Sequence, residues 1–210
     1  MPDKVCVWID NLKKSFAAGF VLGIGCIVKL SCGNDIVGAA LFSTGLFAIC
    51  SFGMNLFTGK IGYIIENKNT PNCFIVWLGN LLGMIFTCGL VRFAKPSLHE
   101  KAAALMENKL EHGVLTTMIL AFFCGVLMFA AVDNYKRHSE GAMKVAGIFL
   151  CVMTFILCGF EHSIANIGYA VLGISSFDDV FPYLVYLIIC SIFNGAGGIA
   201  LWALVKKKKD

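Results

Sequence analysis

Long apolar runs alternate with short polar segments along almost the whole chain. A helix needs roughly 20 predominantly apolar residues to cross a lipid bilayer. One run is interrupted only by Lys29, whose long side chain can reach the membrane interface, and four others carry no charged residue. We therefore predict six transmembrane helices. They cover Ser15–Cys32, Ile36–Gly59, Cys73–Val91, Gly113–Val132, Val145–Ile174 and Val180–Val205.

The composition indicates the same class of protein. Of the 210 residues, 58% are hydrophobic and 14% are charged, and the mean hydropathy is +0.80. A soluble domain is about half apolar and about a quarter charged, and a core of this size cannot hide so many apolar side chains from water. We expect an all-α integral membrane protein with one domain, residues 1–210. No small-residue cleavage site follows the first run, so we expect no secretory signal.

Basic residues predict the orientation of the helices. With the N-terminus inside, 12 of the 17 lysines and arginines fall in inner segments and 5 in outer segments. This bias predicts that both termini are cytoplasmic and that the membrane is the plasma membrane. We expect the basic residues to contact anionic lipid and not nucleic acid. The inner residues are Lys4, Lys13, Lys14, Lys60, Lys68, Lys136, Arg137, Lys144 and Lys206–Lys209.

Two of the apolar runs contain polar residues beside glycine. The fifth carries Glu161 and His162 after Gly159, and the second carries Asn55–Thr58 before Gly59. We predict that both helices break at these points, inside the membrane. A helix that starts there presents unpaired N–H groups and a partial positive charge, which attract anions. Such backbone must be buried in protein or line a wet cavity. The pattern indicates a polar point in an apolar passage.

Short repeats link the two halves of the chain. Lys60–Tyr63 reads KIGY and Asn166–Tyr169 reads NIGY, while Asn80–Gly83 and Asn194–Gly197 both begin with Asn and end with Gly. Their order predicts two three-helix halves, about 12–93 and 110–206. Because three spans per half is an odd number, the halves have opposite orientations, as in many transporters.

Other classes of protein fit the sequence less well. The 10 cysteines lie mostly within spans and form no CxxC pair, so we interpret them as packing residues. His99, His112 and His138 fall at loops or span ends, and no carboxylate cluster accompanies His162. We expect no metal, no cofactor and no enzymatic activity. A water channel with two Asn-Pro-Ala boxes is excluded because neither box is present.

Two motifs resemble the signatures of the formate/nitrite transporter family. They are Asn55–Gly59, which reads NLFTG, and Gly159–Asn166, which reads GFEHSIAN. The resemblance extends over roughly residues 12–206. It implies an aquaporin-like six-helix protomer with broken helices two and five, assembled as a homopentamer with one pore per protomer. It also implies transport of small monovalent anions or their acids.

The resemblance assigns roles to particular residues. His162 corresponds to the central pore histidine, Thr58 to the threonine that hydrogen-bonds near it, and Lys109 to a lysine that draws in anions. The pore and substrate positions that it implies are His162, Thr58, Lys109, Leu46, Leu56, Phe57, Phe42 and Phe155. Phe42 and Leu46 share one helix face, as two pore-lining residues would.

A second group of residues is expected to support the broken helices. We expect Glu161 to hold the break through backbone N–H contacts, with structural roles for Asn166, Asn55 and Gly159. One position departs from the family pattern. Some bacterial members have a pore-side asparagine where this chain has Gly125.

The expected mechanism is transport linked to protons. Basic residues concentrate the anion, which loses water in an apolar funnel and takes a proton from water or through His162. The neutral acid then crosses the constrictions. Formate, nitrite, lactate and acetate all fit, and a hydrosulfide channel or a pH-independent passive anion channel is the alternative.

Overall fold

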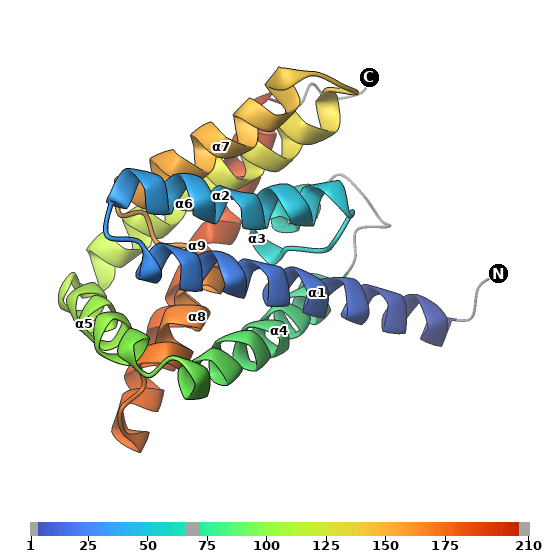
Figure 1. Cartoon of the computed structure of the whole chain (residues 1–210). Helices are drawn as coiled ribbons and strands as arrows, with labels where there is room; N and C mark the ends of the chain where they lie inside the picture. Colours follow the sequence, from blue (N-terminus) through green and yellow to red (C-terminus); the bar gives the residue numbers. More distant parts are fainter. Residues whose placement is uncertain (1–3, 66–71, 206–210) are drawn as a thin grey trace.

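Long helices and shorter helical segments form the protein (Figure 1). The computed structural model describes residues 4–65 and 72–205, and within them it contains no strand. Lys68 and Lys206–Lys209, which belong to the predicted inner lysines, lie outside the described residues. Four helices are long and apolar enough to cross a membrane: α1 (Lys4–Ser31), α4 (Cys73–Ala94), α6 (Gly113–Arg137) and α9 (Val180–Val205).

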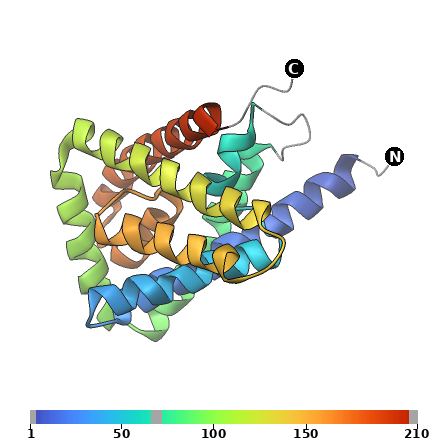
Figure 2. The same ribbon diagram turned by 90° about the horizontal axis from the view of Figure 1, so that it is seen from above.

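The second and fifth apolar runs are each broken, as predicted. The second forms α2 (Asp35–Ser51), α3 (Phe57–Lys60) and the 3₁₀ turn η1 (Ile61–Tyr63). The fifth forms α7 (Ala142–Leu157) and α8 (Ser163–Gly173). The segments after the breaks lie inside the bundle, where the longer helices surround α8 in both views (Figures 1 and 2).

Both breaks have the same backbone geometry. Gly53 (φ +64°) and Gly159 (φ +67°) adopt left-handed conformations that a glycine tolerates without strain. After each glycine the chain folds back: Met54 N donates to Ile49 O at 2.9 Å, and Phe160 N donates to Phe155 O at 2.9 Å. This six-to-one bond is the Schellman motif of helix C-termini. Gly159 and Gly53 thus lie at the turns that end α7 and α2.

One asparagine on α4 supports the first break. The Asn80 side chain is fully buried, and its Oδ1 accepts from the Phe57 N–H at 2.8 Å. Its Nδ2 donates to Asn55 O at 2.8 Å and to Ser15 O at 2.7 Å. Asn80 therefore joins α1, the broken segment and the start of α3, and it satisfies backbone groups that no water can reach.

An asparagine on α9 does the same at the second break. Asn194 Oδ1 accepts from the Ser163 N–H at 2.8 Å, while its Nδ2 donates to Glu161 O at 2.8 Å and to Ala121 O at 2.7 Å. Asn194 thus makes in the second half the three bonds that Asn80 makes in the first. The weak sequence echo between these asparagines marks a shared structural role.

The contacts between helices in the first half of the chain recur in the second half. Helix α1 packs against α4 and α2, and α6 packs against α9 and α7. Contacts between α2 and α7, and between α4 and α8, join the two sets. The remaining two elements are the 3₁₀ turn η2 (Phe177–Asp179) and α5 (Ser97–Glu111).

Helix α5 was missed by the sequence analysis, which treated this segment as a loop. Its charged residues conceal an amphipathic pattern in which Leu98, Ala102 and Met106 recur every four residues and are buried. The helix packs against α8, so it belongs to the wall around the second break.

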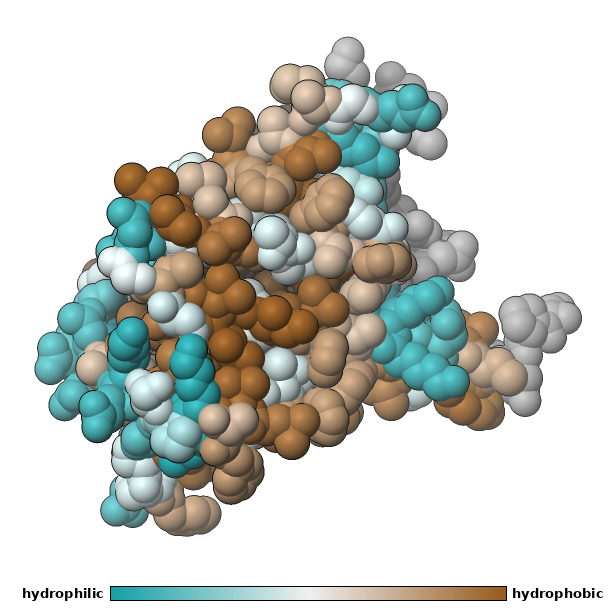
Figure 3. Space-filling view, viewed as in Figure 1, coloured by the Kyte–Doolittle hydropathy of each residue, from teal (hydrophilic) through white to brown (hydrophobic). Residues whose placement is uncertain are grey.

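A broad apolar belt covers the outside of the bundle. Brown residues spread across the face that carries α1 and α2, and teal residues gather toward its edges (Figure 3). Several large side chains in the described residues are strongly exposed: Phe74, Phe93, Leu115, Leu150, Phe181 and Leu204. A surface of this kind needs lipid or another apolar surface against it.

Gly125 lies in the contact between α6 and α9. A Cβ at this position would be 2.1 Å from Asn194 O. Glycine here lets the two helices approach closely, as small residues do in membrane helix pairs.

We predict that Gly125→Ala destabilises the protein by about 1–3 kcal/mol, because the added methyl group would displace backbone. The measurement is thermal unfolding of the purified protein in detergent. Gly89→Ala on α4 is the control, because nothing lies within 4 Å of a Cβ there. Equal melting temperatures for the two variants would contradict the prediction.

Candidate functional site

His162 lies at the second break and joins the two broken helices. Its side chain is 1% exposed, and it caps α8 by accepting the Ala165 N–H at its Nδ1, at 3.1 Å. Its Nε2 lies 3.1 Å from Thr58 Oγ1 on α3. Because Nδ1 accepts, the ring proton of the neutral imidazole belongs on Nε2, which donates to Thr58. His162 and Thr58 therefore lie within hydrogen-bonding distance of each other.

Thr58 can offer a hydrogen bond of its own. The residue is fully buried in the first turn of α3. Its oxygen accepts from His162, and its hydroxyl makes no other hydrogen bond to the described residues. A hydroxyl carries one donor besides its acceptor sites, so the Thr58 O–H remains available for an anion or acid beside it.

Aromatic and aliphatic side chains border this polar pair. The Phe42 and Phe155 rings meet edge to face with their centroids 5.9 Å apart, and the Phe155 centroid lies 5.4 Å from that of His162. Leu46 lies one turn from Phe42 on α2, and both are buried. Leu56 directly precedes α3 and is also buried.

A cavity of about 450 Å³ reaches His162 from the side of α5. We refer to it as the large cavity. Lys29, Lys101 and Lys109 contribute to its wall, and Phe155 and His162 lie among its inner residues. Lys29 forms an ion pair with Asp35 at the rim, and Lys101 Nζ donates to Leu30 O at 3.3 Å.

Glu161 forms a buried ion pair with Lys109, which lies in the wall of the large cavity. The carboxylate is 1% exposed, and its Oε2 accepts from Lys109 Nζ at 2.5 Å and from Asn166 Nδ2 at 2.8 Å. Asn166 also donates to the Tyr186 hydroxyl at 3.2 Å. The predicted use of backbone N–H groups by the carboxylate is wrong, because the side chain is held by Lys109 and Asn166. The Glu161 backbone makes two bonds at the break. Its N–H donates to Leu120 O at 3.3 Å, and its carbonyl accepts from Asn194 Nδ2 at 2.8 Å.

A smaller cavity of about 70 Å³ opens on the other side of Leu56. We refer to it as the small cavity. Lys60, Lys136 and Tyr135 contribute to its wall, and Lys136 Nζ lies 3.6 Å above the ring of Tyr63. Both cavities are therefore basic, and the polar pair of His162 and Thr58 lies between them.

Phe57 lies in a different place from the other predicted pore residues. Its N–H starts α3, and its side chain lines an apolar groove with Phe74, Trp77 and Ile188, in neither the large nor the small cavity. Asn80 and Asn194 are not among the site residues predicted from the sequence. Their Asn…Gly echo was the signal that could have identified them.

The fold and the site together are those of a helical membrane protein with a polar pair between two cavities that lysines help to line. Residues 7–207 match the family model described as formate/nitrite transporter, and the chain belongs to this family. Members of the family are channels and transporters, not enzymes.

Curated relatives carry names of the same kind. The chain is 31% identical over 172 residues to the nitrite transporter NirC of Escherichia coli, covering 72% of this chain and 64% of that protein. It is 25% identical over 155 residues to the formate channel FocA of Haemophilus influenzae, covering 67% of this chain and 55% of that one. The matched part of the chain thus spans less than two thirds of these relatives.

Solved structures share the fold over nearly the whole chain. A structure described as a pentameric formate channel with formate bound matches with a TM-score of 0.76 at 20% identity, covering 97% of this chain and 98% of that one. A structure described as an FNT family ion channel matches with a TM-score of 0.75 at 21% identity, covering 96% and 89%. These matches confirm the fold class.

We predict that Lys109→Met destabilises the protein by about 3–5 kcal/mol, because the Glu161 carboxylate would remain buried without its cation. The double variant Lys109→Met with Glu161→Gln should recover much of this loss. Thermal unfolding in detergent measures both. Lys29→Met is the control, because its partner Asp35 has a side chain 85% exposed and such pairs contribute little. A double variant no more stable than Lys109→Met would argue against the buried pair.

Proposed function

We propose that this protein is a channel for small monovalent anions or their neutral acids, with transport linked to protons. Formate, nitrite, lactate and acetate are the candidate substrates. The observation that carries the proposal is the contact between His162 and Thr58 at the junction of two broken helices, between two basic cavities. The names of the relatives, which include nitrite transporters and formate channels, support the same substrate class.

The order of the residues suggests a route for the substrate. From the large cavity it passes Phe42 and Phe155, reaches His162 and Thr58, and continues past Leu46 and Leu56 to the small cavity. The aromatic and aliphatic borders penalise a bare ion far more than a small neutral acid, because a charge loses its hydration there. The substrate therefore crosses these borders in its protonated form.

The hydrogen bonds of His162 bear on the source of the proton. Its Nδ1 already accepts a hydrogen bond from the Ala165 N–H. A proton on Nδ1 would point at this N–H group, so protonation would break the hydrogen bond that caps α8. The Nε2 proton cannot leave alone without forming an imidazolate. Of the two sources expected from the sequence, water in the large cavity fits these contacts better, with His162 acting as a hydrogen-bond donor.

The wider architecture is part of the proposal. The matching glycine turns and asparagine bonds support two related halves, about 12–93 and 110–206, with opposite orientations. The positive-inside bias supports cytoplasmic termini in a plasma membrane. A homopentamer is supported by the fold shared with a pentameric formate channel and by the exposed apolar belt.

We predict that uptake of formate or nitrite by proteoliposomes rises as the pH on the side of the large cavity falls, because more substrate is protonated. Thr58→Val should lower the maximal flux about tenfold, the effect of losing one hydrogen bond to the substrate. Thr44→Val is the control, because Thr44 is exposed on α2 and its hydroxyl donates to Leu41 O at 2.6 Å.

A competition series with formate, nitrite, lactate, acetate and hydrosulfide in the same assay would rank the substrates. Flux that ignored pH and followed only the membrane potential would replace the proton-linked version with a passive anion channel. Flux of none of these substrates would overturn the proposed function as a whole.

A further inference from the structure

Three sulfur atoms meet at one point against α8. Apart from the backbone of α8 itself, the heavy atoms nearest to a Cβ added at Gly168 would be Cys26 Sγ, Cys88 Sγ and Met84 Sδ, each at 3.2 Å. The centre of the circle through the three sulfur atoms therefore lies no more than 3.2 Å from each of them. All three side chains are fully buried, and none of them lines the large or the small cavity. We refer to these atoms as the sulfur cluster.

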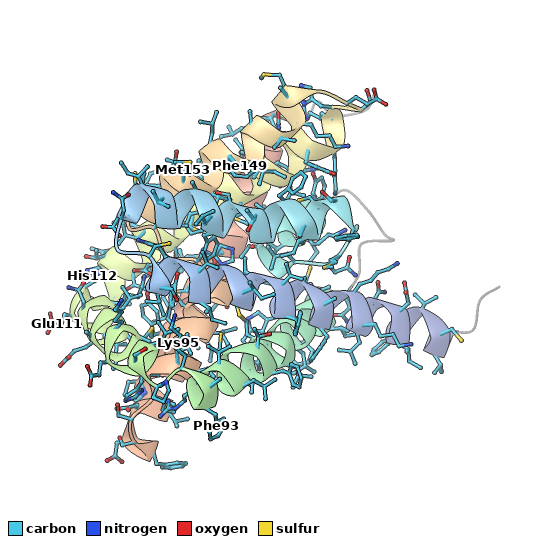
Figure 4. The ribbon with its side chains drawn as sticks, viewed as in Figure 1. Phe93, Lys95, Glu111, His112, Phe149 and Met153 are labelled. Atoms are coloured by element: carbon cyan, nitrogen blue, oxygen red, sulfur yellow. The ribbon has the colours of Figure 1, made fainter. Side chains whose placement is uncertain are left out.

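Three helices bring the sulfur cluster together. Met84 and Cys88 are four residues apart on α4, so they share one face of that helix. This face is buried, whereas Phe93 near the end of α4 is 86% exposed and points away from the bundle (Figure 4). Cys26 comes from α1, which packs against both α4 and α8. Because Gly168 has no side chain, the space between the sulfur atoms and α8 is not filled from the side of α8.

The corresponding glycine in the first half of the chain has different neighbours. Gly62 has the place in KIGY that Gly168 has in NIGY. A Cβ added at Gly62 would lie 2.4 Å from a ring carbon of Phe129 and 2.9 Å from Gly198 O. Packing is the role expected for the cysteines from the sequence, and at Gly62 an aromatic ring provides the packing without sulfur. The sulfur cluster is therefore a feature of the second half that the shared architecture does not require.

The sulfur cluster lies directly behind the wall of the large cavity. Cys26 Sγ donates to Ala165 O at 3.6 Å, and the Tyr169 hydroxyl donates to the same sulfur atom. Ala165 and Tyr169 both line the large cavity. The route from the water of this cavity to the sulfur cluster therefore crosses one layer of residues.

We propose that the sulfur cluster binds one soft monovalent cation of the Cu(I) and Ag(I) type. Thiolate and thioether sulfur select such cations, whereas Mg²⁺ and Ca²⁺ prefer oxygen ligands. Within residues 4–65 and 72–205, no group of three histidine, cysteine or acidic residues could hold a metal ion, so the Met84 thioether completes the set of three ligands. Each thiol that binds the cation loses its proton to water as the metal–sulfur bond forms, and no oxidation state changes. This inference goes beyond the proposed function and does not depend on it.

The experiment measures how much silver the purified full chain retains. The protein in detergent and chloride-free buffer is loaded with Ag(I), washed with an excess of a free monothiol and separated by gel filtration. Three sulfur ligands held in place by the fold should keep the cation, whereas a single cysteine should lose it to the competing thiol. We expect about one silver ion per chain by elemental analysis, and a higher melting temperature of the loaded protein, because a ligand that binds only the folded state stabilises it.

Three variants test the ligands. Met84→Leu is the most direct, because it nearly conserves the volume of the side chain and removes the sulfur atom. Cys26→Ser and Cys88→Ser each remove one thiol. We expect the silver retained by each variant to fall about tenfold under the same wash. Cys151→Ser is the control, because Cys151 lies on α7, outside the sulfur cluster, and this variant should retain silver as the wild-type protein does. Melting temperatures without silver check that each variant is folded.

The inference is overturned if the wild-type protein retains no silver. It is also overturned if Met84→Leu and the double variant Cys26→Ser with Cys88→Ser retain as much silver as the wild-type protein, because other cysteines would then hold it. An equal loss of silver in Cys151→Ser and Met84→Leu would have the same meaning. None of these outcomes bears on the proposed function, because no flux is measured. Absence of anion flux would conversely overturn the proposed function and leave the sulfur cluster as it is.

Discussion

Backbone hydrogen bonding at the two helix breaks is the constraint on which the rest of the structure depends. A helix interrupted inside an apolar bundle exposes N–H and C=O groups that neither lipid nor water can satisfy. Asn80 and Asn194 each accept one N–H and donate to two carbonyls, and the glycines at 53 and 159 turn the chain between the segments. Because the same solution appears twice, the geometry around the site is fixed from both halves of the chain.

The second break also determines what His162 can do. The ring is the cap of α8 and a partner of Thr58 at once, so one nitrogen belongs to the scaffold and the other to the polar centre. A side chain with both duties is held in one orientation, and its protonation state is tied to the integrity of the helix start. This coupling explains how a titratable residue can lie inside an apolar bundle without carrying a permanent charge.

Basic side chains lie on both sides of this centre. On the side of the large cavity, Lys109 and Lys29 have carboxylate partners, and the buried pair with Glu161 also helps to hold the broken segment. On the side of the small cavity, Lys136 lies over the ring of Tyr63, and Lys60 lies in the cavity wall. The structural need to neutralise Glu161 thus limits how strongly the large cavity can attract anions.

The sequence alone determined the class of protein and the positions of the breaks, and the resemblance to a known family implied the pairing of His162 with Thr58. Apolar runs and glycine act locally, so they can be recognised without knowledge of neighbouring helices. Other features required the tertiary structure. They are the role of α5, the partners of Glu161, the place of Phe57 in an apolar groove and the close contact at Gly125. Each depends on which residues meet across helices far apart in the chain. Spacing along one helix does not contain that information, because close packing between helices decides which face of each is buried.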